Sequence, residues 1–228
     1  MSKQARRISR AHKLLGLVIG IQILFWTASG FYFTLFPIER IHGDHLRHEA
    51  PAPDFSDLGD IAAPQLTLPA AQLEIREVLG RPVWVARGDG WTGLYETTTG
   101  EQLSPLGEAA VRKIAEEAWA GQGEIVSVER IDNPPRETFS KKPLWRVQFD
   151  GKDKATFWVD AEEAKILAVR TGEWRLFDVL WRFHIMDVTG EDRFDTWWLK
   201  IAAFLGLTTV LFGLALLVQR ALRGRLLK

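Results

Sequence analysis

Residues 14–36 read LLGLVIGIQILFWTASGFYFTLF and contain no charged side chain. An α-helix needs roughly 20 apolar residues, at about 1.5 Å of rise each, to cross a bilayer. Residues 1–13 before this run are basic, through Lys3, Arg6, Arg7, Arg10 and Lys13. Because basic flanks favour the cytoplasmic side, we expect a transmembrane helix over 14–36 with residues 1–13 in the cytoplasm.

A cleaved export signal is the alternative interpretation of this N-terminus, because it also combines a basic start with an apolar run. The run here is longer than such a signal needs. In addition, the small residues Ala28, Ser29 and Gly30 are followed by more apolar sequence, FYFTLF. These features favour an uncleaved membrane anchor.

A second uncharged run, IAAFLGLTTVLFGLALLV, occupies residues 201–218. Trp197, Trp198 and Leu199 extend it toward the N-terminus, so we expect a second transmembrane helix over 197–219. The tail 220–228 is basic again, which favours a cytoplasmic C-terminus. The sequence therefore predicts a membrane hairpin of two transmembrane helices in a bacterial inner membrane, with the central residues on the periplasmic side.

The composition excludes several classes of function. Lys plus Arg and Asp plus Glu each total 29, so no large field of one sign favours nucleic-acid binding. The chain has no cysteine, which excludes thiol catalysis, iron–sulfur clusters and cysteine-ligated zinc. P-loop and HExxH motifs are also absent from the sequence.

The region between the two apolar runs shows an internal repeat of an α+β unit, in which a helix precedes antiparallel strands. The expected helices cover 68–80 and 104–121, and the expected strands cover 82–87, 91–97, 124–131, 143–150, 155–164 and 165–170. We therefore expect a duplicated α+β domain over 68–172. A histidine-containing segment and a linker rich in proline and alanine are expected over 37–67.

The second copy resembles the PepSY domain, with a helix followed by strands that read PLWRVQF and TFWVDAEEAKILAVR. The motifs RAHKLLGLVIG, SGFYFTLFP and LWRFHIMD are similar to those of PepSY-associated membrane proteins. One departure is the turn between the last two strands, where AEEA at 161–164 replaces the usual acidic residue and glycine. The resemblance covers nearly the whole chain and implies a periplasmic PepSY-like domain.

This resemblance implies two kinds of function. Isolated PepSY domains resemble inhibitory propeptides of secreted peptidases, which implies a non-catalytic module that binds or regulates an envelope peptidase or another membrane partner. Membrane-bound relatives are associated with iron acquisition, and some larger ones bind haem and pass electrons to periplasmic ferric complexes. The second resemblance implies a haem b protein that acts in a ferric-siderophore reductase.

Histidines on the expected outer side are the candidate iron ligands. His184 lies among apolar residues in the amphipathic segment 173–196, and His42, His45 and His48 follow the first apolar run. A bis-histidine haem needs two neutral imidazoles on opposite sides of the iron. We expect His184 to pair with His45, whose GDHL context matches the membrane family best. Zinc ligands and ordinary interfacial histidines are the alternatives.

His12 lies at the opposite, cytoplasmic end of the first apolar run. A helix of about 24 residues separates it from the outer side by roughly 35 Å, so it cannot share an iron with His184. It would need a ligand from a second copy of this chain or from another membrane protein. We therefore expect a homodimer or a membrane partner, within the lipid bilayer, to complete a haem site.

Overall fold

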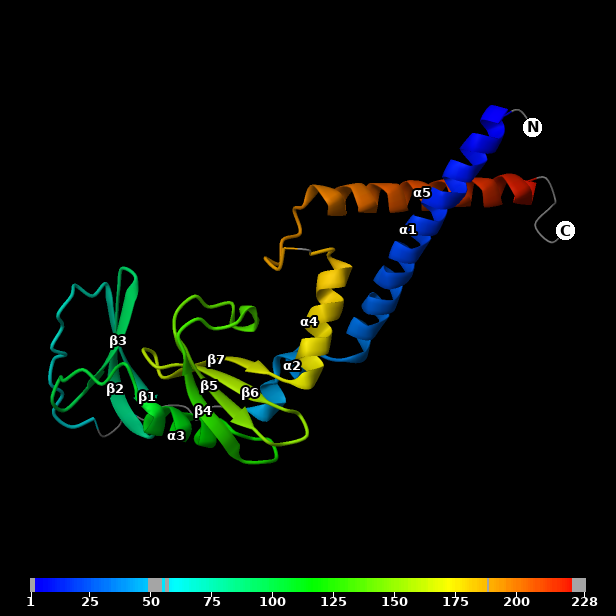
Figure 1. Ribbon diagram of the computed structural model, residues 1–228. Coiled ribbons are helices and arrows are strands. Elements are labelled where there is room, and N and C mark those ends of the chain that lie inside the picture. Colours follow the sequence, from blue (N-terminus) through cyan, green and yellow to red (C-terminus); the bar gives the residue numbers. More distant parts are fainter. Residues whose placement is uncertain (1–2, 49–54, 56–57, 188, 223–228) are drawn as a thin grey trace. The chain divides into compact units, whose positions relative to one another are not determined.

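The computed structural model describes residues 3–48, 55, 58–187 and 189–222, without the side chains of residues 3–15, 212–213, 215–217 and 219–220. It is an α+β fold with two antiparallel sheets, and the described residues form five α-helices (Figure 1). The basic side chains of residues 1–13 and most of the basic tail 220–228 lie outside the described part.

The chain divides into two compact units. The helical unit comprises residues 1–37 and 176–228, and the domain unit comprises residues 38–175. The helical unit contains α1 (Lys3–Leu35), most of α4 (Gly172–His184) and α5 (Trp197–Leu222). The domain unit contains both sheets together with α2 (Ile38–His42) and α3 (Glu108–Ala118).

The larger sheet has the strand order β4-β5-β6-β7, and every neighbouring pair is antiparallel. Its strands are β4 (Ile125–Ile131), β5 (Leu144–Phe149), β6 (Thr156–Asp160) and β7 (Lys165–Arg170). They confirm the strands expected for the second copy, although β6 is shorter. The chain turns at 161–164, where Asp160 Oδ1 accepts the backbone N–H groups of Glu162 and Glu163 at 2.8 and 3.3 Å.

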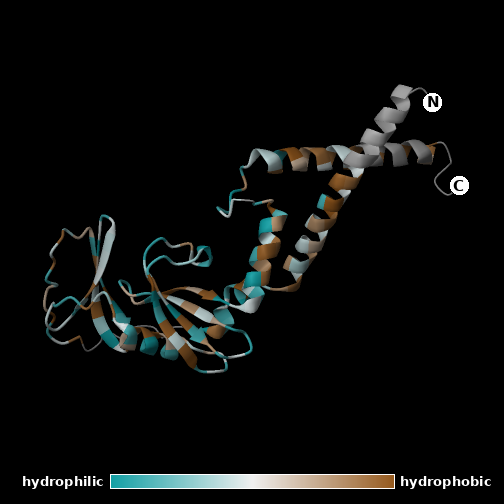
Figure 2. Cartoon of the chain, viewed as in Figure 1, coloured by the Kyte–Doolittle hydropathy of each residue, from teal (hydrophilic) through white to brown (hydrophobic). Residues whose placement is uncertain are grey.

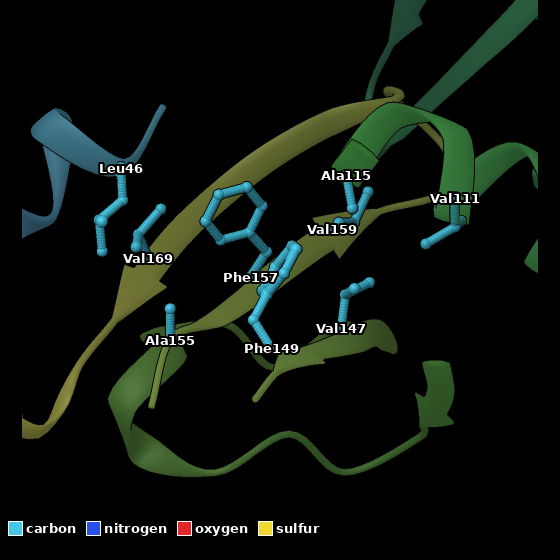
Figure 3. Close-up of a cluster of buried hydrophobic side chains, with 9 residues drawn as sticks. All are labelled: Leu46, Val111, Ala115, Val147, Phe149, Ala155, Phe157, Val159 and Val169. Carbon is cyan, nitrogen blue, oxygen red and sulfur yellow. The ribbon is translucent and has the colours of Figure 1, made fainter. Parts of the chain in front are cut away.

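One face of the larger sheet forms the main hydrophobic core (Figure 3). Side chains alternate along β6, so Phe157 and Val159 enter this core while Trp158 packs on the opposite face. Both faces are covered, and β6 is accordingly buried along its whole length. This explains why the sequence of β6 is almost continuously apolar.

Helix α3 covers this core and is shorter than the expected helix over 104–121. Gly107 caps its start in an extended conformation, and Trp119 returns to an extended conformation at its end. The side chains that α3 buries are Val111 and Ala115. Ile114 and Ala118 are partly buried and pack against the same core.

The smaller sheet, with the order β1-β2-β3, corrects the helix expected over 68–80. That region forms β1 (Gln72–Val78), which pairs with β2 (Arg81–Gly88), and β3 (Trp91–Glu96) follows. Leu79 and Gly80 both have positive φ, at 52° and 69°, and connect the paired residues Val78 and Arg81. Two such residues make a tight hairpin turn. The first copy is therefore a three-stranded meander without a helix.

The histidine segment belongs to the domain unit, which begins at Ile38, before the expected domain start at residue 68. Ile41 is fully buried in α2, and Leu46 joins the main core (Figure 3). The backbone N–H of His48 donates to Ala118 O at 2.9 Å, and Ala120 N–H donates to Leu46 O at 3.0 Å. Residues 38–48 are thus part of the folded domain. Much of the linker expected after them, residues 49–54 and 56–57, lies outside the described residues.

Helix α1 contains the stretch Gly16–Leu35, which is long and apolar enough to cross a membrane. Large apolar side chains are exposed along it, including Leu17 at 62% and Leu24 at 67%. In α5 the described apolar stretch is Trp197–Leu211, which is shorter (Figure 2). One candidate span is therefore seen among the described residues, and the second span of the expected membrane hairpin stays a prediction.

Candidate functional site

His184 is the last residue of α4 and is held against α1 within the helical unit. Its Nδ1 lies 2.8 Å from Ser29 Oγ, and its backbone carbonyl accepts the indole N–H of Trp26 at 2.7 Å. The Ser29 hydroxyl donates to Phe25 O at 2.6 Å. Because a hydroxyl has a single proton, Ser29 accepts from His184, so Nδ1 carries the imidazole proton.

This arrangement leaves Nε2 of His184 as the nitrogen with a free lone pair. Among the described residues, Nε2 has no hydrogen-bond partner. Burial lowers the pKa of the His184 imidazole, which favours the neutral ring. A neutral imidazole whose Nδ1–H is hydrogen-bonded and whose Nε2 is open is the form in which histidine binds a metal.

Aromatic rings surround the imidazole of His184. The ring of Trp181 is stacked parallel to it with centroids 6.2 Å apart, and Phe33 approaches edge-on at 5.5 Å. Phe177 packs on Phe33 at 4.7 Å. Helix α4 is amphipathic, and this face of it lies against α1. Apart from the Ser29 hydroxyl and the Trp26 indole N–H, the side chains around the imidazole are therefore aromatic.

The three outer histidines belong to the domain unit, and their side chains are exposed. His42 ends α2, His45 lies in a single helical turn over Asp44–Leu46, and His48 follows that turn. Hydrogen bonds from Arg40 lower the pKa of the Glu173 carboxyl, and His45 lies close enough to contribute to the same shift. Since His45 and His184 belong to different units, the structure describes the surroundings of each but not the expected pairing.

His12 lies in α1, and its side chain is outside the described residues. Its backbone position is seventeen residues from Ser29 along one helix, which corresponds to about 26 Å. That His12 cannot share an iron with His184 stays a prediction from helix length. Within the described part of the chain, no group of three or more His, Cys, Asp or Glu side chains is placed to hold a metal ion.

A groove of about 380 Å³ in the domain unit is a second candidate site. It lies between the two sheets, and its lining includes the aromatic residues Trp91, Tyr95 and Trp145. Charged residues of both signs also line it, namely Arg130, Lys142, Asp160 and Glu162. A concave surface of this size with mixed aromatic and charged walls suits a peptide or a small ligand.

The sequence pointed to His184 but not to the residues that hold it. Ser29 and Trp26 are more than 150 positions away in sequence, and only the packing of α4 on α1 brings them together. Ser29 did carry a signal, because a hydroxyl inside an apolar run needs a hydrogen-bond partner.

Comparison with protein-family models, curated proteins and solved structures finds no match to this chain.

Proposed function

We propose that this chain is a PepSY-type inner-membrane protein that binds haem b through His184 and takes part in electron transfer to periplasmic ferric siderophore. The observation that carries the proposal is the orientation of the imidazole. Ser29 holds Nδ1–H, and Nε2 is left without a partner among the described residues. Histidines that ligate iron are oriented by such a hydrogen bond on the other ring nitrogen.

The residues around His184 fit a haem better than a zinc ion. Trp181 and Phe33 offer flat apolar surface, whereas a structural zinc site needs four close nitrogen, sulfur or oxygen ligands. When bound, haem iron would supply one-electron chemistry between Fe(III) and Fe(II). The chain itself would provide the axial nitrogen, fix its direction and keep water away from one side.

A second imidazole for the iron would come from outside the described helical unit, because His184 is the only histidine of that unit with a described side chain. The candidates are His45 of the same chain and His184 of the partner subunit in a homodimer. In the second case a two-fold axis would place two identical imidazoles across one iron. His12 would bind a separate haem on the cytoplasmic side in the same way.

The contact between α1 and α5 supports the membrane hairpin. A Cβ on Gly206 would lie 3.8 Å from the ring of Trp26. Trp26 is nine residues before the end of α1, and Gly206 is nine residues after the start of α5. The apolar stretches Gly16–Leu35 and Trp197–Leu211 therefore touch near their middles.

Visible spectroscopy of the full chain tests the proposal. The protein is purified in mild detergent from haem-replete cells, and its absorption is recorded before and after reduction with dithionite. We expect a Soret band with sharp α and β bands in the reduced protein, lost in His184→Ala. Colourless wild-type protein, or an unchanged spectrum in His184→Ala, would refute haem binding at this site.

The source of the second ligand follows from a matched set of variants. If His45 is the ligand, His45→Ala gives a high-spin spectrum while His42→Ala and His48→Ala keep the wild-type spectrum. If the partner subunit supplies it, all three variants keep the low-spin spectrum. The protein then holds one outer haem for every two chains.

The groove between the sheets favours a second candidate function, a non-catalytic interaction module that binds or regulates an envelope peptidase. A photo-crosslinking amino acid at Thr92, which lines the groove, is compared in intact cells with one at the exposed Lys113 of α3. This function is supported if the crosslinker at position 92 gives a discrete adduct that contains a peptidase and the crosslinker at position 113 does not. The same pattern at both positions, or no adduct at either, counts against it.

A further inference from the structure

A cavity of about 340 Å³ lies within the helical unit, between α1 and α4. Three of its lining residues are apolar and three are polar. They are Val179, Phe183 and Met186, and Gln22, Arg182 and Asp187. The His184–Ser29 pair does not line it, so this cavity is distinct from the proposed haem ligand.

Two of the polar lining residues carry donors that are buried and unsatisfied. Neither Gln22 Nε2 nor Arg182 Nε has a hydrogen-bond partner among the described residues. Arg182 Nε lies 3.8 Å from Asp187 Oδ2, which is too far for a hydrogen bond. A ligand oxygen that accepts from these donors would remove the cost of burying them unpaired.

The charges around the cavity favour a neutral acceptor. Arg182 contributes a positive charge and Asp187 a negative one, so the two largely offset each other. Asp187 is fixed in place because its Oδ1 accepts hydrogen bonds from Gly190 N–H, Thr189 N–H and the Thr189 hydroxyl. A ligand carboxylate or phosphate would face this fixed carboxylate, whereas a carbonyl oxygen would not be repelled.

The position of the cavity along α1 further restricts which ligands can reach it. Gln22 is six residues after Gly16 and thirteen before Leu35, about 9 Å and 20 Å from the ends of the candidate span. Ester carbonyls of phospholipids stay near the membrane surface, so they do not reach this depth without drawing the head group inward. A ligand there must bring its acceptor oxygens into the hydrocarbon region, as the head group of a lipid-soluble quinone does.

We propose that the cavity lined by Gln22, Arg182 and Phe183 binds the head group of a lipid-soluble quinone. A ring carbonyl accepts from the two unsatisfied donors, and the flat ring packs on Phe183 and Met186. The proposal deepens the proposed function by naming a class of electron carrier. It rests on that function for the role of the quinone, but quinone binding itself does not require haem.

Quinone binding to the full chain provides the test. Protein in nanodiscs of quinone-free dioleoylphosphatidylcholine is titrated with decylubiquinone, and the dissociation constant is measured by calorimetry. Gln22→Leu is expected to weaken binding about tenfold, because it removes a donor while keeping similar volume. Thr27→Val on the same helix is the matched control, since the Thr27 hydroxyl donates only to Ile23 O at 2.9 Å.

Two further variants separate the possible failures. Phe183→Ala is expected to weaken binding as well, which keeps the test valid if Gln22→Leu folds poorly. His184→Ala is expected to lose haem and keep quinone affinity, so the two functions fail independently. The proposal is overturned if wild-type protein shows no saturable binding, if both cavity variants bind like Thr27→Val, or if added phosphatidylglycerol displaces the quinone.

Discussion

Ser29 Oγ on α1 and Nδ1 of His184 at the end of α4 lie 2.8 Å apart, which joins two helices that are 155 positions apart in sequence. The bond fixes both the rotation of the imidazole and the nitrogen that carries its proton. Anything bound at Nε2 would therefore be affected by the loss of a hydroxyl on the other side of the ring.

If His184 binds haem as proposed, Ser29→Ala should retain the haem spectrum but weaken haem affinity by about tenfold, since hydrogen bonds that orient a metal ligand typically contribute this much. The reduction potential should rise, because an imidazole without its Nδ1–H acceptor is a weaker donor to Fe(III). Spectroelectrochemical titration measures the potential. Thr27→Val removes another α1 hydroxyl and should leave the potential unchanged, while an unchanged potential in Ser29→Ala would contradict the orienting role.

Gly43→Ala is expected to destabilise the domain unit by about 2–4 kcal/mol. Gly43 has φ of 78°, and a Cβ there would lie 2.5 Å from Val169 Cγ1. Gly80→Ala is the matched control, because φ is 69° there and nothing lies within 4 Å of the added Cβ. Thermal unfolding followed by tryptophan fluorescence should show the larger loss for Gly43→Ala, and equal losses would mean that β7 yields to the new methyl group.

Glu137 connects several elements on the face of the larger sheet that carries Trp158, opposite the main core. Its carboxylate accepts from Trp158 Nε1 at 3.0 Å and pairs with Arg175 at 3.2 Å, and its backbone carbonyl accepts from Arg170 at 2.6 Å. Glu137→Ala leaves the buried indole N–H of Trp158 unpaired and should cost about 1–3 kcal/mol. Glu137→Gln keeps an acceptor for Trp158, so chemical denaturation should show a smaller loss for it than for Glu137→Ala.

The ion pair between Arg40 and Glu173 predicts an acid-sensitive contribution to stability. Hydrogen bonds from Arg40, at 2.6 and 2.9 Å, lower the pKa of Glu173. A depressed carboxyl pKa stabilises the fold above the ordinary value of about 4.3, and this stability is lost as the pH falls through the depressed value. Both side chains are partly exposed, so the effect is small.

The midpoint temperature of thermal unfolding should therefore fall less between pH 5 and pH 3 in Arg40→Gln than in the wild type. This is roughly the window that spans the ordinary carboxyl pKa. Arg47→Gln, which removes the exposed pair with Asp44 at 3.2 Å, serves as the control for loss of a cation. Identical acid profiles for wild type and Arg40→Gln would show that the Arg40 pair does not contribute.

The sequence predicted the larger sheet well because its strands are short runs rich in β-branched and aromatic residues, separated by clear turns. It failed at β1, where the helix-forming composition of 68–80 outweighed the two-residue alternation of Leu73 and Ile75 and the turn signal of Gly80. Pairing with β2 is a tertiary effect, and a helix propensity of a few tenths of a kcal/mol per residue does not resist it.

The candidate site was only partly predictable for a similar reason. His184 was recognisable from its apolar neighbours in sequence, whereas its contact with Ser29 depends on how α4 packs on α1. The unsatisfied donors of Gln22 and Arg182 are also a property of packing. Residue types suggest chemistry, but the distances that make a site arise from contacts between distant segments.

The burial of Ile41 and Leu46 bears on how this protein can be dissected. A soluble fragment starting at residue 68, the first position of the expected repeat, would expose the apolar surface that these two residues cover and would be prone to aggregate. A fragment starting at Ile38 retains both side chains and is the shorter piece suited to crystallisation. Insertions between 38 and 48 should be tolerated as poorly as insertions into a core strand.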